Sequence, residues 1–303
     1  MSQRVRFIAL AKVAFAVTVW GASFIATKIA LQEISPVTVI WLRFGIGVVI
    51  LGVIMLAREK VTLPSLRELA YFSLLGFLGI TFHQWLQVTG LITSQATTTA
   101  WIITTIPIFI ALLGWLILGE KLSWISAGGI ALAGFGVLIV VAHGDLGTLL
   151  HGQFGAPGDL LILISAPNWA VFSVLSRRGL QKQSATQMMF YVMSFGWIFT
   201  SLWLLAAGRL HDFASLSTGG WTAVLFLGIF CSGLAYIFWY DALKAIPASQ
   251  VGSLLYLEPI VAVAVAAMLL QEPLLVVEFF GGALILFGVW LVNRRRTLES
   301  PPD

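Results

Sequence analysis

The sequence predicts an all-α integral membrane protein with ten transmembrane helices, arranged as two inverted five-helix repeats. Composition, hydropathy and loop charge are the observations that predict this class. Of the 303 residues, 59% are hydrophobic and 10% are charged, whereas a soluble protein carries about 25% charged residues. Ten helices of about 20 residues each would take roughly two thirds of such a chain. Short loops and tails account for the rest, so no soluble domain is expected.

Ten predominantly apolar segments are long enough to cross a bilayer as helices. They cover residues 8–30, 37–57, 70–91, 96–118, 123–142, 158–177, 186–206, 220–243, 248–270 and 276–293. The basic start of the chain, followed by an apolar run, also resembles a secretory signal. We favour a retained first span, because nine spans follow it and Trp20-Gly21 would be an unusual interior for a cleaved segment.

Loop charge predicts the orientation through the positive-inside rule. Fourteen basic residues fall on the side of the two termini, and only Lys28 and Arg209 fall on the other side. We therefore expect cytoplasmic termini in a bacterial inner membrane. The same topology explains the net charge of +4 without a nucleic-acid partner, which would require a clustered basic face exposed to water. Contact with anionic membrane lipid is compatible with it.

An internal repeat divides the chain into two halves, 1–150 and 151–303. Residues 76–140 align with 228–292 at a constant offset of 152, and an offset of 149 pairs Trp20 with Trp169. Five helices in each half start the second half on the opposite side of the membrane. Inverted-topology repeats of this kind give many secondary transporters alternating access to a midplane site. Inverted halves that only pack together are the alternative.

Motifs in both halves resemble those of a known family. They are Trp20-Gly21 with Lys28, Trp41-Leu42-Arg43-Phe44, Glu258-Pro259, and the repeat pairs Glu120/Glu272 and Gly129/Gly281. With the spans and the repeat, they resemble the EamA-type members of the drug/metabolite transporter superfamily over about 12–141 and 158–292. The resemblance implies a ten-helix carrier that exports amino acids or other small metabolites. The aromatic content is similar to that of YddG-type aromatic amino acid exporters.

Polar side chains in spans three and four are candidate substrate ligands, because such groups are expected to face the bundle interior or a water-filled cavity. His83 and Gln87 share one helix face and could bond an ammonium or a carboxylate, or be satisfied by neighbouring helices. Thr97 and Trp101 share a face of span four, where Pro107 predicts a kink. The threonines could instead mediate helix packing.

Aromatic residues of spans one, six and nine extend the predicted cavity wall. Trp20 and Trp169 are repeat mates near mid-span, and Asn168 departs from the first-half pattern beside Trp169. Tyr256 precedes the second proline break, at Pro259. Aromatic rings can stack on a planar side chain or attract an ammonium, which favours aromatic and larger apolar amino acids. Core packing is the alternative reading for each tryptophan.

Two charges lie inside the predicted spans. Glu258 lies at the midplane of span nine, and Arg43 lies about two turns inside span two. Glu258 could couple transport to protons or bond backbone amides freed at the proline break, and we favour the structural role. Arg43 has no evident partner in the sequence, so we expect it to bond backbone carbonyls rather than substrate.

Glycines seven residues apart place small residues on one face of spans five and ten. The pairs are Gly129 with Gly136 and Gly281 with Gly288. Such faces allow close helix packing, either within a monomer or between the subunits of a homodimer.

These observations predict a secondary transporter that exports amino acids, aromatic and apolar ones preferred, or similar small metabolites. Other drug-like solutes are the alternative substrates. A membrane-embedded lipid-modifying enzyme is less favoured, because the four histidines are scattered and paired acids are missing from the spans. A regulatory membrane subunit is a third possibility. No cofactor or metal is expected, because there is one cysteine and no GxxxxGK[ST] loop for ATP.

Overall fold

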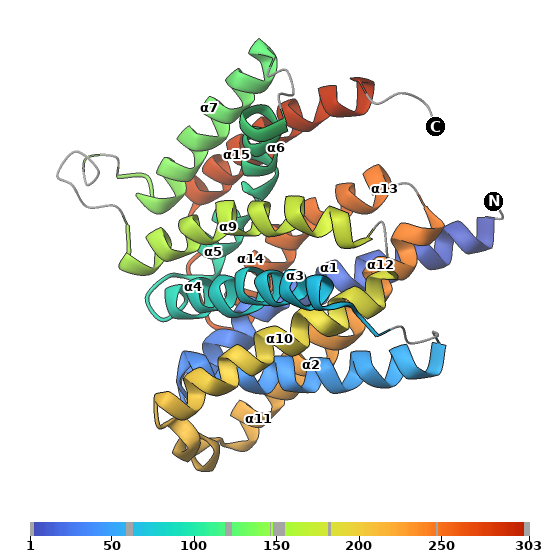
Figure 1. The fold of residues 1–303 in the computed structure, drawn as a ribbon. Coiled ribbons are helices and arrows are strands. Elements are labelled where there is room, and N and C mark those ends of the chain that lie inside the picture. The colour runs from blue at the N-terminus through green and yellow to red at the C-terminus, as the bar shows by residue number, and fades with distance from the viewer. Residues whose placement is uncertain are drawn as a thin grey trace.

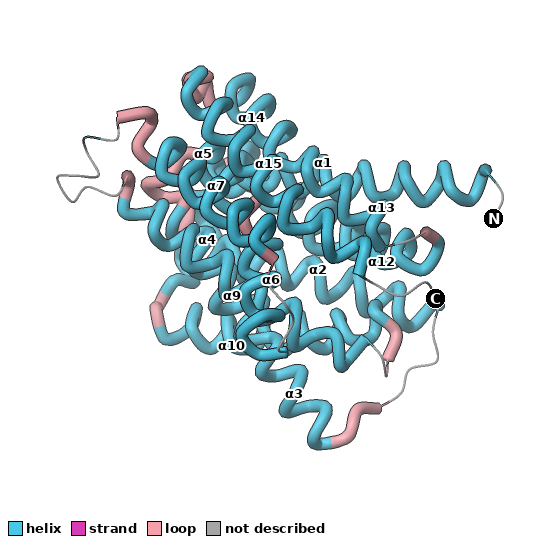
Figure 2. The backbone as a smooth tube through the Cα atoms, turned by 90° about the horizontal axis from the view of Figure 1, so that it is seen from above, coloured by secondary structure: helices cyan, strands magenta, loops and turns pink. Residues whose placement is uncertain are grey.

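The computed structural model is helical across the residues that it describes, which are 3–58, 63–118, 123–145, 147, 155–180, 183–246 and 248–299. No strand occurs in these ranges. Ten helices within them are long and apolar enough to cross a membrane, which confirms the predicted fold class. The loops that the structure describes between them are short (Figures 1 and 2). The chain is therefore a multi-pass membrane protein.

The first five spans are formed by single or interrupted helices. They are α1 (Gln3–Leu31); α2 (Pro36–Arg58); α3 (Leu66–Gly76), η1 (Phe77–Phe82) and α4 (His83–Gly90); α5 (Ala96–Ile103) and α6 (Ile106–Leu118); and α7 (Trp124–Val141). The other five are α9 (Pro157–Leu180); α10 (Ala185–Ala206); α11 (Thr218–Leu225), η3 (Phe226–Leu234) and α12 (Ala235–Ala245); α13 (Ala248–Ser253), η4 (Leu254–Leu257) and α14 (Glu258–Leu269); and α15 (Val276–Glu299). A short 3-10 helix, η2 (Arg209–Ser215), lies between α10 and α11.

Serine side chains cap several of these helices. Ser65 and Glu68 form a reciprocal capping box at the start of α3. Ser123, Ser184 and Ser217 accept a backbone hydrogen bond at the starts of α7, α10 and α11. A serine hydroxyl satisfies a donor that the first helical turn leaves free, so these residues determine where four spans begin.

Four spans are interrupted near mid-membrane. The breaks predicted beside the two prolines are present: the turn at Thr104–Thr105 separates α5 from α6, and η4 precedes Glu258-Pro259. Two π-helical segments, η1 and η3, were not predicted from the sequence. At the repeat offset of 152, η1 corresponds to residues 229–234, which lie within η3. Each half therefore has a π-helical break in its third span and a break in its fourth.

The packing partners of the spans also come in pairs. α1 packs against α12 and α14, whereas its counterpart α9 packs against α4, α5 and α6. Similarly, α2 packs against η3 and α10 packs against η1. A Cβ at Gly76 would meet the backbone of α10, and one at its repeat mate Gly228 would meet Ile46 of α2. This pairing fits the predicted inverted repeat.

The paired glycines lie between α7 and α15, which run side by side (Figure 1). A Cβ at Gly129 or Gly136 would lie 2.6 Å from the carbonyl oxygen of Gly288 or Gly281, respectively. These glycines therefore pack one half of the chain against the other. Of the two interpretations left open by the sequence, the structure shows packing within the chain.

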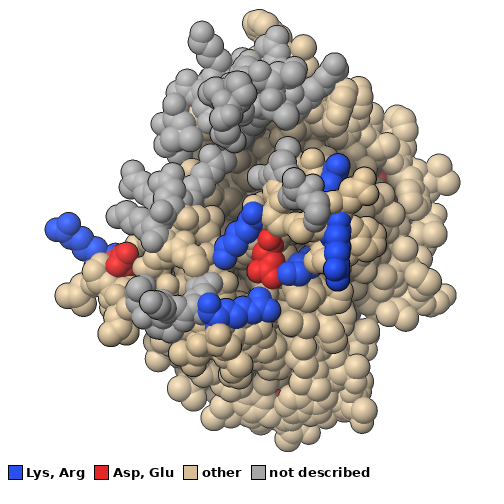
Figure 3. Space-filling view, turned by 90° about the vertical axis from the view of Figure 1, so that its right-hand side faces the viewer, with Lys and Arg blue, Asp and Glu red and all other residues tan. Residues whose placement is uncertain are grey.

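One end of the bundle, here called the termini end, holds the start of α1 and the end of α15 (Figure 1). There the Asp241 carboxylate lies 2.6 Å from Lys12 Nζ and 3.6 Å from Arg58 Nη1. Figure 3, which faces this end, shows acidic atoms among basic side chains. Other basic residues assigned to this side lie outside the described residues or side chains. They are Lys60, Lys121, Arg177, Arg178, Lys182 and Arg294 to Arg296, and Glu120 also lies outside them.

Replacing Gly136 by alanine tests the helix contact. We expect Gly136→Ala to lower the free energy of unfolding by about 1–3 kcal/mol, because the added methyl group overpacks a backbone contact. Gly134→Ala is the control, since nothing lies within 4 Å of a Cβ at that position. It should be neutral or stabilise by up to about 1 kcal/mol. Thermal unfolding in detergent measures both variants, and equal losses would contradict the assigned contact.

Candidate substrate site

A group of polar and aromatic side chains from both halves lies inside the bundle. We call it the central cluster, and its members are Trp20, Arg43, His83, Gln84, Trp169, Ser232, Tyr236 and Glu258. Spans one, two, three, six, eight and nine contribute to it.

Arg43 is positioned by a close approach between α2 and η3. A Cβ at Gly47 would lie 2.9 Å from Ser232 Cβ, so the two segments meet one turn along from Arg43. Arg43 is 7% exposed, and its guanidinium donates from Nε to Ser232 Oγ (3.2 Å) and from Nη1 to Gln84 Oε1 (3.1 Å). The expectation that Arg43 bonds backbone carbonyls is wrong, because α2 faces two polar side chains at this level.

Trp20 and Glu258 are brought together where α1 meets α14. A Cβ at Gly21 would lie 2.7 Å from the carbonyl oxygen of Glu258, which accounts for glycine beside the tryptophan. The indole Nε1 of Trp20 donates to the carbonyl oxygen of Cys231 in η3 (3.1 Å). The Trp20 ring contacts Tyr236 edge-on, with centroids 5.6 Å apart. The break in span eight is thus joined directly to the first span.

His83 and Trp169 form the equivalent contact between spans three and six. Their ring centroids lie 4.6 Å apart. His83 is 3% exposed, and its Nδ1 atom has no hydrogen-bond partner in the described part of the chain. The neighbouring Asn168 donates from Nδ2 to the carbonyl oxygen of Leu78 in η1 (2.8 Å). Each π-helical break therefore receives a hydrogen bond from the first span of the other half.

Tyr236, Tyr240 and Glu258 lie deep in the bundle, and none of them is fully enclosed. Protein atoms surround all three, yet each keeps a partly accessible surface. We infer from these two properties that the three side chains border an internal space. The Glu258 carboxylate has no hydrogen-bond partner among the described residues, and its oxygens are not fully buried. The expected bonds from Glu258 to backbone amides at the proline break are therefore absent from this conformation.

Three predicted site residues make other contacts. Trp101 is 4% exposed and packs on Gly282 of α15. The Tyr256 hydroxyl accepts a hydrogen bond from Asn293 Nδ2 (2.9 Å). Thr97 donates from Oγ1 to Glu272 (2.9 Å). In this conformation all three join one helix or loop to another.

The remaining predicted residue, Gln87, is partly buried one turn beyond His83. Three members of the central cluster, Gln84, Ser232 and Tyr236, were not predicted from the sequence. Gln84 and Tyr236 are repeat mates at the offset of 152, and that relation is the signal that could have found them.

The end opposite the termini, here called the far end, is closed by contacts centred on Glu272. Its carboxylate accepts hydrogen bonds from the backbone N–H groups of Ala96 (2.8 Å) and Thr97 (3.0 Å), and it thereby caps α5. Lys28 Nζ donates to the carbonyl oxygen of Ser94 (2.6 Å) and lies 3.9 Å from Glu272. Ser94 Oγ donates in turn to Asp159 (2.6 Å). These contacts connect spans one, four, six and nine.

Two loop carboxylates strengthen the same end. Hydrogen bonds from the Ser217 hydroxyl and N–H to Glu33 (both 2.6 Å) lower the pKa of that carboxyl. Burial opposes ionisation of Asp212, but hydrogen bonds from Ser35 and Thr38 outweigh it and lower its pKa. A carboxyl with a lowered pKa contributes stability above its unfolded pKa, and this is lost as pH falls through the folded pKa.

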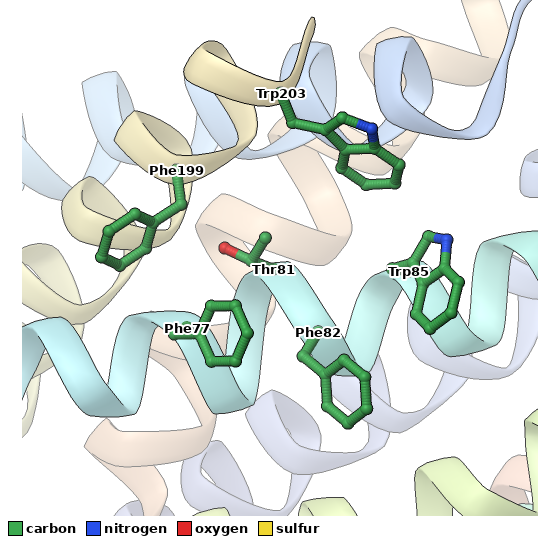
Figure 4. Close-up of a pocket in the computed structure, with 6 residues that line it drawn as sticks. All are labelled: Phe77, Thr81, Phe82, Trp85, Phe199 and Trp203. Carbon is green, nitrogen blue, oxygen red and sulfur yellow. The ribbon is translucent and has the colours of Figure 1, made fainter. Parts of the chain in front are cut away.

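An aromatic hollow of about 460 Å³ lies between span three and α10. Figure 4 shows Phe77, Thr81, Phe82 and Trp85 on one helix and Phe199 and Trp203 on the facing one. The Thr81 hydroxyl, its one aliphatic alcohol, already donates to the carbonyl oxygen of Gly196 (3.1 Å), and Phe77 is 45% exposed. This lining suits a lipid acyl chain better than a charged or zwitterionic solute.

Ten helices that are long and apolar enough to cross a membrane, with a cluster of polar and aromatic side chains inside the bundle, define a multi-pass membrane protein with a polar centre. The chain belongs to the EamA-like transporter family, whose sequence model matches residues 7–142 and again 156–294. It is therefore a transporter and not an enzyme.

Similar proteins span nearly the same length. An uncharacterized transporter of Archaeoglobus fulgidus is 28% identical over 93% of this chain and 96% of its own. A probable terminal-alkyne amino-acid exporter of Streptantibioticus cattleyicolor is 26% identical (92% and 91%), and a probable amino-acid metabolite efflux pump of Escherichia coli is 27% identical (91% and 91%). A crystal structure with 23% identity superposes with a TM-score of 0.64 over 96% of this chain and 99% of the other, which supports the fold.

The Asp212 contact gives a pH-dependent prediction. Asp212→Asn should lower the free energy of unfolding at pH 7 by about 1 kcal/mol, because hydrogen bonds to a charged acceptor become neutral ones. The difference from wild type should shrink as pH falls through the lowered pKa of the folded carboxyl, below which the native side chain is also neutral. Thermal unfolding over an acidic pH series measures this, with Arg209→Gln, a change at an exposed residue of η2, as control. A difference that stays constant across the whole series would show that charge is not its source.

Proposed function

We propose that this chain is a secondary transporter that exports amino acids, aromatic and other apolar ones preferred, across the bacterial inner membrane by alternating access. The central cluster carries the proposal, because it combines a buried cation, an accessible carboxylate and aromatic rings inside the bundle. The names of the Streptantibioticus and Escherichia relatives, an amino-acid exporter and an amino-acid metabolite efflux pump, support the same class of substrate.

The balance of side chains in the cluster favours a zwitterion with an apolar side chain. Burying apolar surface contributes about 25 cal/mol per Å², and Trp20, Trp169 and Tyr236 offer rings for such contact. One cation and one carboxylate match a solute with no net charge. An anion or cation of higher charge would leave part of its charge unpaired at a high desolvation cost.

Alternating access assigns opposite roles to the two ends of the bundle. The termini end is cytoplasmic in this proposal, and the far end, closed by the contacts of Glu272, faces the periplasm. Export then requires the far end to open while the termini end closes. The halves 1–150 and 151–303 exchange conformations, and the breaks in spans three, four, eight and nine are the positions where the helices bend. A monomer suffices, since the glycine faces of α7 and α15 are used within the chain.

Uptake into proteoliposomes tests the substrate class. With protein as the sole addition, counterflow of labelled phenylalanine, tryptophan and leucine should be saturable and should exceed that of glutamate or lysine. Trp169→Ala should lower the apparent affinity by about tenfold, as expected for losing about 1.4 kcal/mol of ring contact. Trp124→Ala is the matched control, since that ring is 93% exposed. No flux of any amino acid by folded protein would refute the proposal.

Loss of the Glu272 contacts should favour opening of the far end. Removing a helix-capping side chain costs about 1–2 kcal/mol, so Glu272→Ala should raise the population of the outward-open form several-fold. A cysteine at Gln87, labelled by an impermeant maleimide from the periplasmic side, reports this opening in whole cells. Leu274→Ala, a change at an exposed residue of the same loop, is the control. An unchanged labelling rate in Glu272→Ala would contradict a gating role.

A further inference from the structure

Arg43 is a buried cation with hydrogen-bonding capacity left over. A guanidinium has five N–H groups, and the bonds to Ser232 and Gln84 use one on Nε and one on Nη1. Nη2 has no partner among the described residues and is not one of the polar atoms sealed inside the bundle. No described acidic side chain lies within 4.0 Å of the guanidinium. Since a buried charge without a counter-ion is costly, this position favours an anion.

Glu258 offers the opposite charge to the same internal space. Its carboxylate is accessible and makes no hydrogen bond in the described part of the chain. It begins α14, where the helix dipole favours a negative charge. The close approach at Gly21 keeps this residue beside α1 and Trp20.

Tyr236 connects the two charges. Its ring contacts Trp20, with centroids 5.6 Å apart. Trp20 bonds Cys231, the neighbour of the Ser232 that accepts from Arg43, and Gly21 beside Trp20 meets the backbone of Glu258. Among the described residues, Arg43 and Glu258 form no ion pair within 4.0 Å, so the cation and the carboxylate are held apart with these two rings in the contacts between them. An α-amino acid carries its carboxylate and its ammonium on one carbon. Two hydrogen bonds of about 3 Å each would let it bridge a gap too wide for direct pairing.

We propose that the central cluster binds the two ionic groups of an α-amino acid separately, with the carboxylate on Arg43 and the ammonium on Glu258. This inference rests on the proposed function and specifies its substrate as a compound with both ionic groups free. The carboxylate pairs with the open edge of the guanidinium through charge-assisted bonds. The side chain of the substrate then lies against the ring of Trp20 or Tyr236.

Competition against labelled phenylalanine in proteoliposomes tests this assignment. The competitors are phenylalanine, phenylalaninamide, which lacks the carboxylate, and 3-phenylpropionate, which lacks the ammonium. In the wild type, both analogues should compete at least about tenfold more weakly, because each loses a bond to a charged group. If the wild type moves no amino acid at all, the proposed function fails. If it moves phenylalanine but binds either analogue equally well, only the present inference fails.

The variants should show a crossed pattern. Arg43→Gln should remove the advantage of phenylalanine over phenylalaninamide and leave its advantage over 3-phenylpropionate. Glu258→Gln should do the reverse, and Arg43→Lys should restore part of the carboxylate preference. Arg209→Gln, a change at an exposed loop residue, should alter neither ratio. If Arg43→Gln does not fold, Arg43→Lys and Glu258→Gln carry the test. An unchanged preference for the carboxylate in the Arg43 variants would overturn the assignment.

Discussion

The cost of holding a guanidinium inside a membrane-crossing bundle constrains the rest of this structure. Arg43 lies about two turns inside α2, where exposure to lipid would be strongly unfavourable. It is instead enclosed by Ser232 of η3 and Gln84 of α4, which come from different halves of the chain. Holding those two oxygens in reach requires spans two, three and eight to meet at one level. Gly47 permits this meeting, because a Cβ there would lie 2.9 Å from Ser232 Cβ.

Glycines allow helices to approach one another closely in other parts of the bundle as well. Gly21 brings α14 against α1, and the glycines of α7 and α15 bring the ends of the two halves together. The far end is then closed by capping and ionic contacts around Glu272, whereas Asp241 joins two basic residues at the termini end. The central cluster therefore lies between two ends that are held by polar contacts. Polar groups that lose these partners can bond water instead, and the net free-energy cost is small. This suits a protein that alternates between states.

Some of this arrangement could be predicted from the sequence, and some could not. The ten spans follow from hydropathy, and the breaks beside Pro107 and Pro259 follow from the missing amide of proline. Trp20, His83, Trp169, Arg43 and Glu258 were identified because polar and aromatic groups are unusual at mid-span. The partners of Arg43 could not be identified in this way, since Gln84 and Ser232 meet it only through the packing of three spans. The hydrogen bond from Thr97 to Glu272 joins residues that are far apart in the sequence. The π-helical segments have no local signature in the sequence.

A structure determined with bound phenylalanine tests the central claim most directly. We predict density for one amino acid in the internal space near Tyr236, with its carboxylate within hydrogen-bond distance of the Arg43 guanidinium and its ammonium facing Glu258. Phenylalanine found in the aromatic hollow between span three and α10, with Arg43 still bonded only to Ser232 and Gln84, would contradict the account.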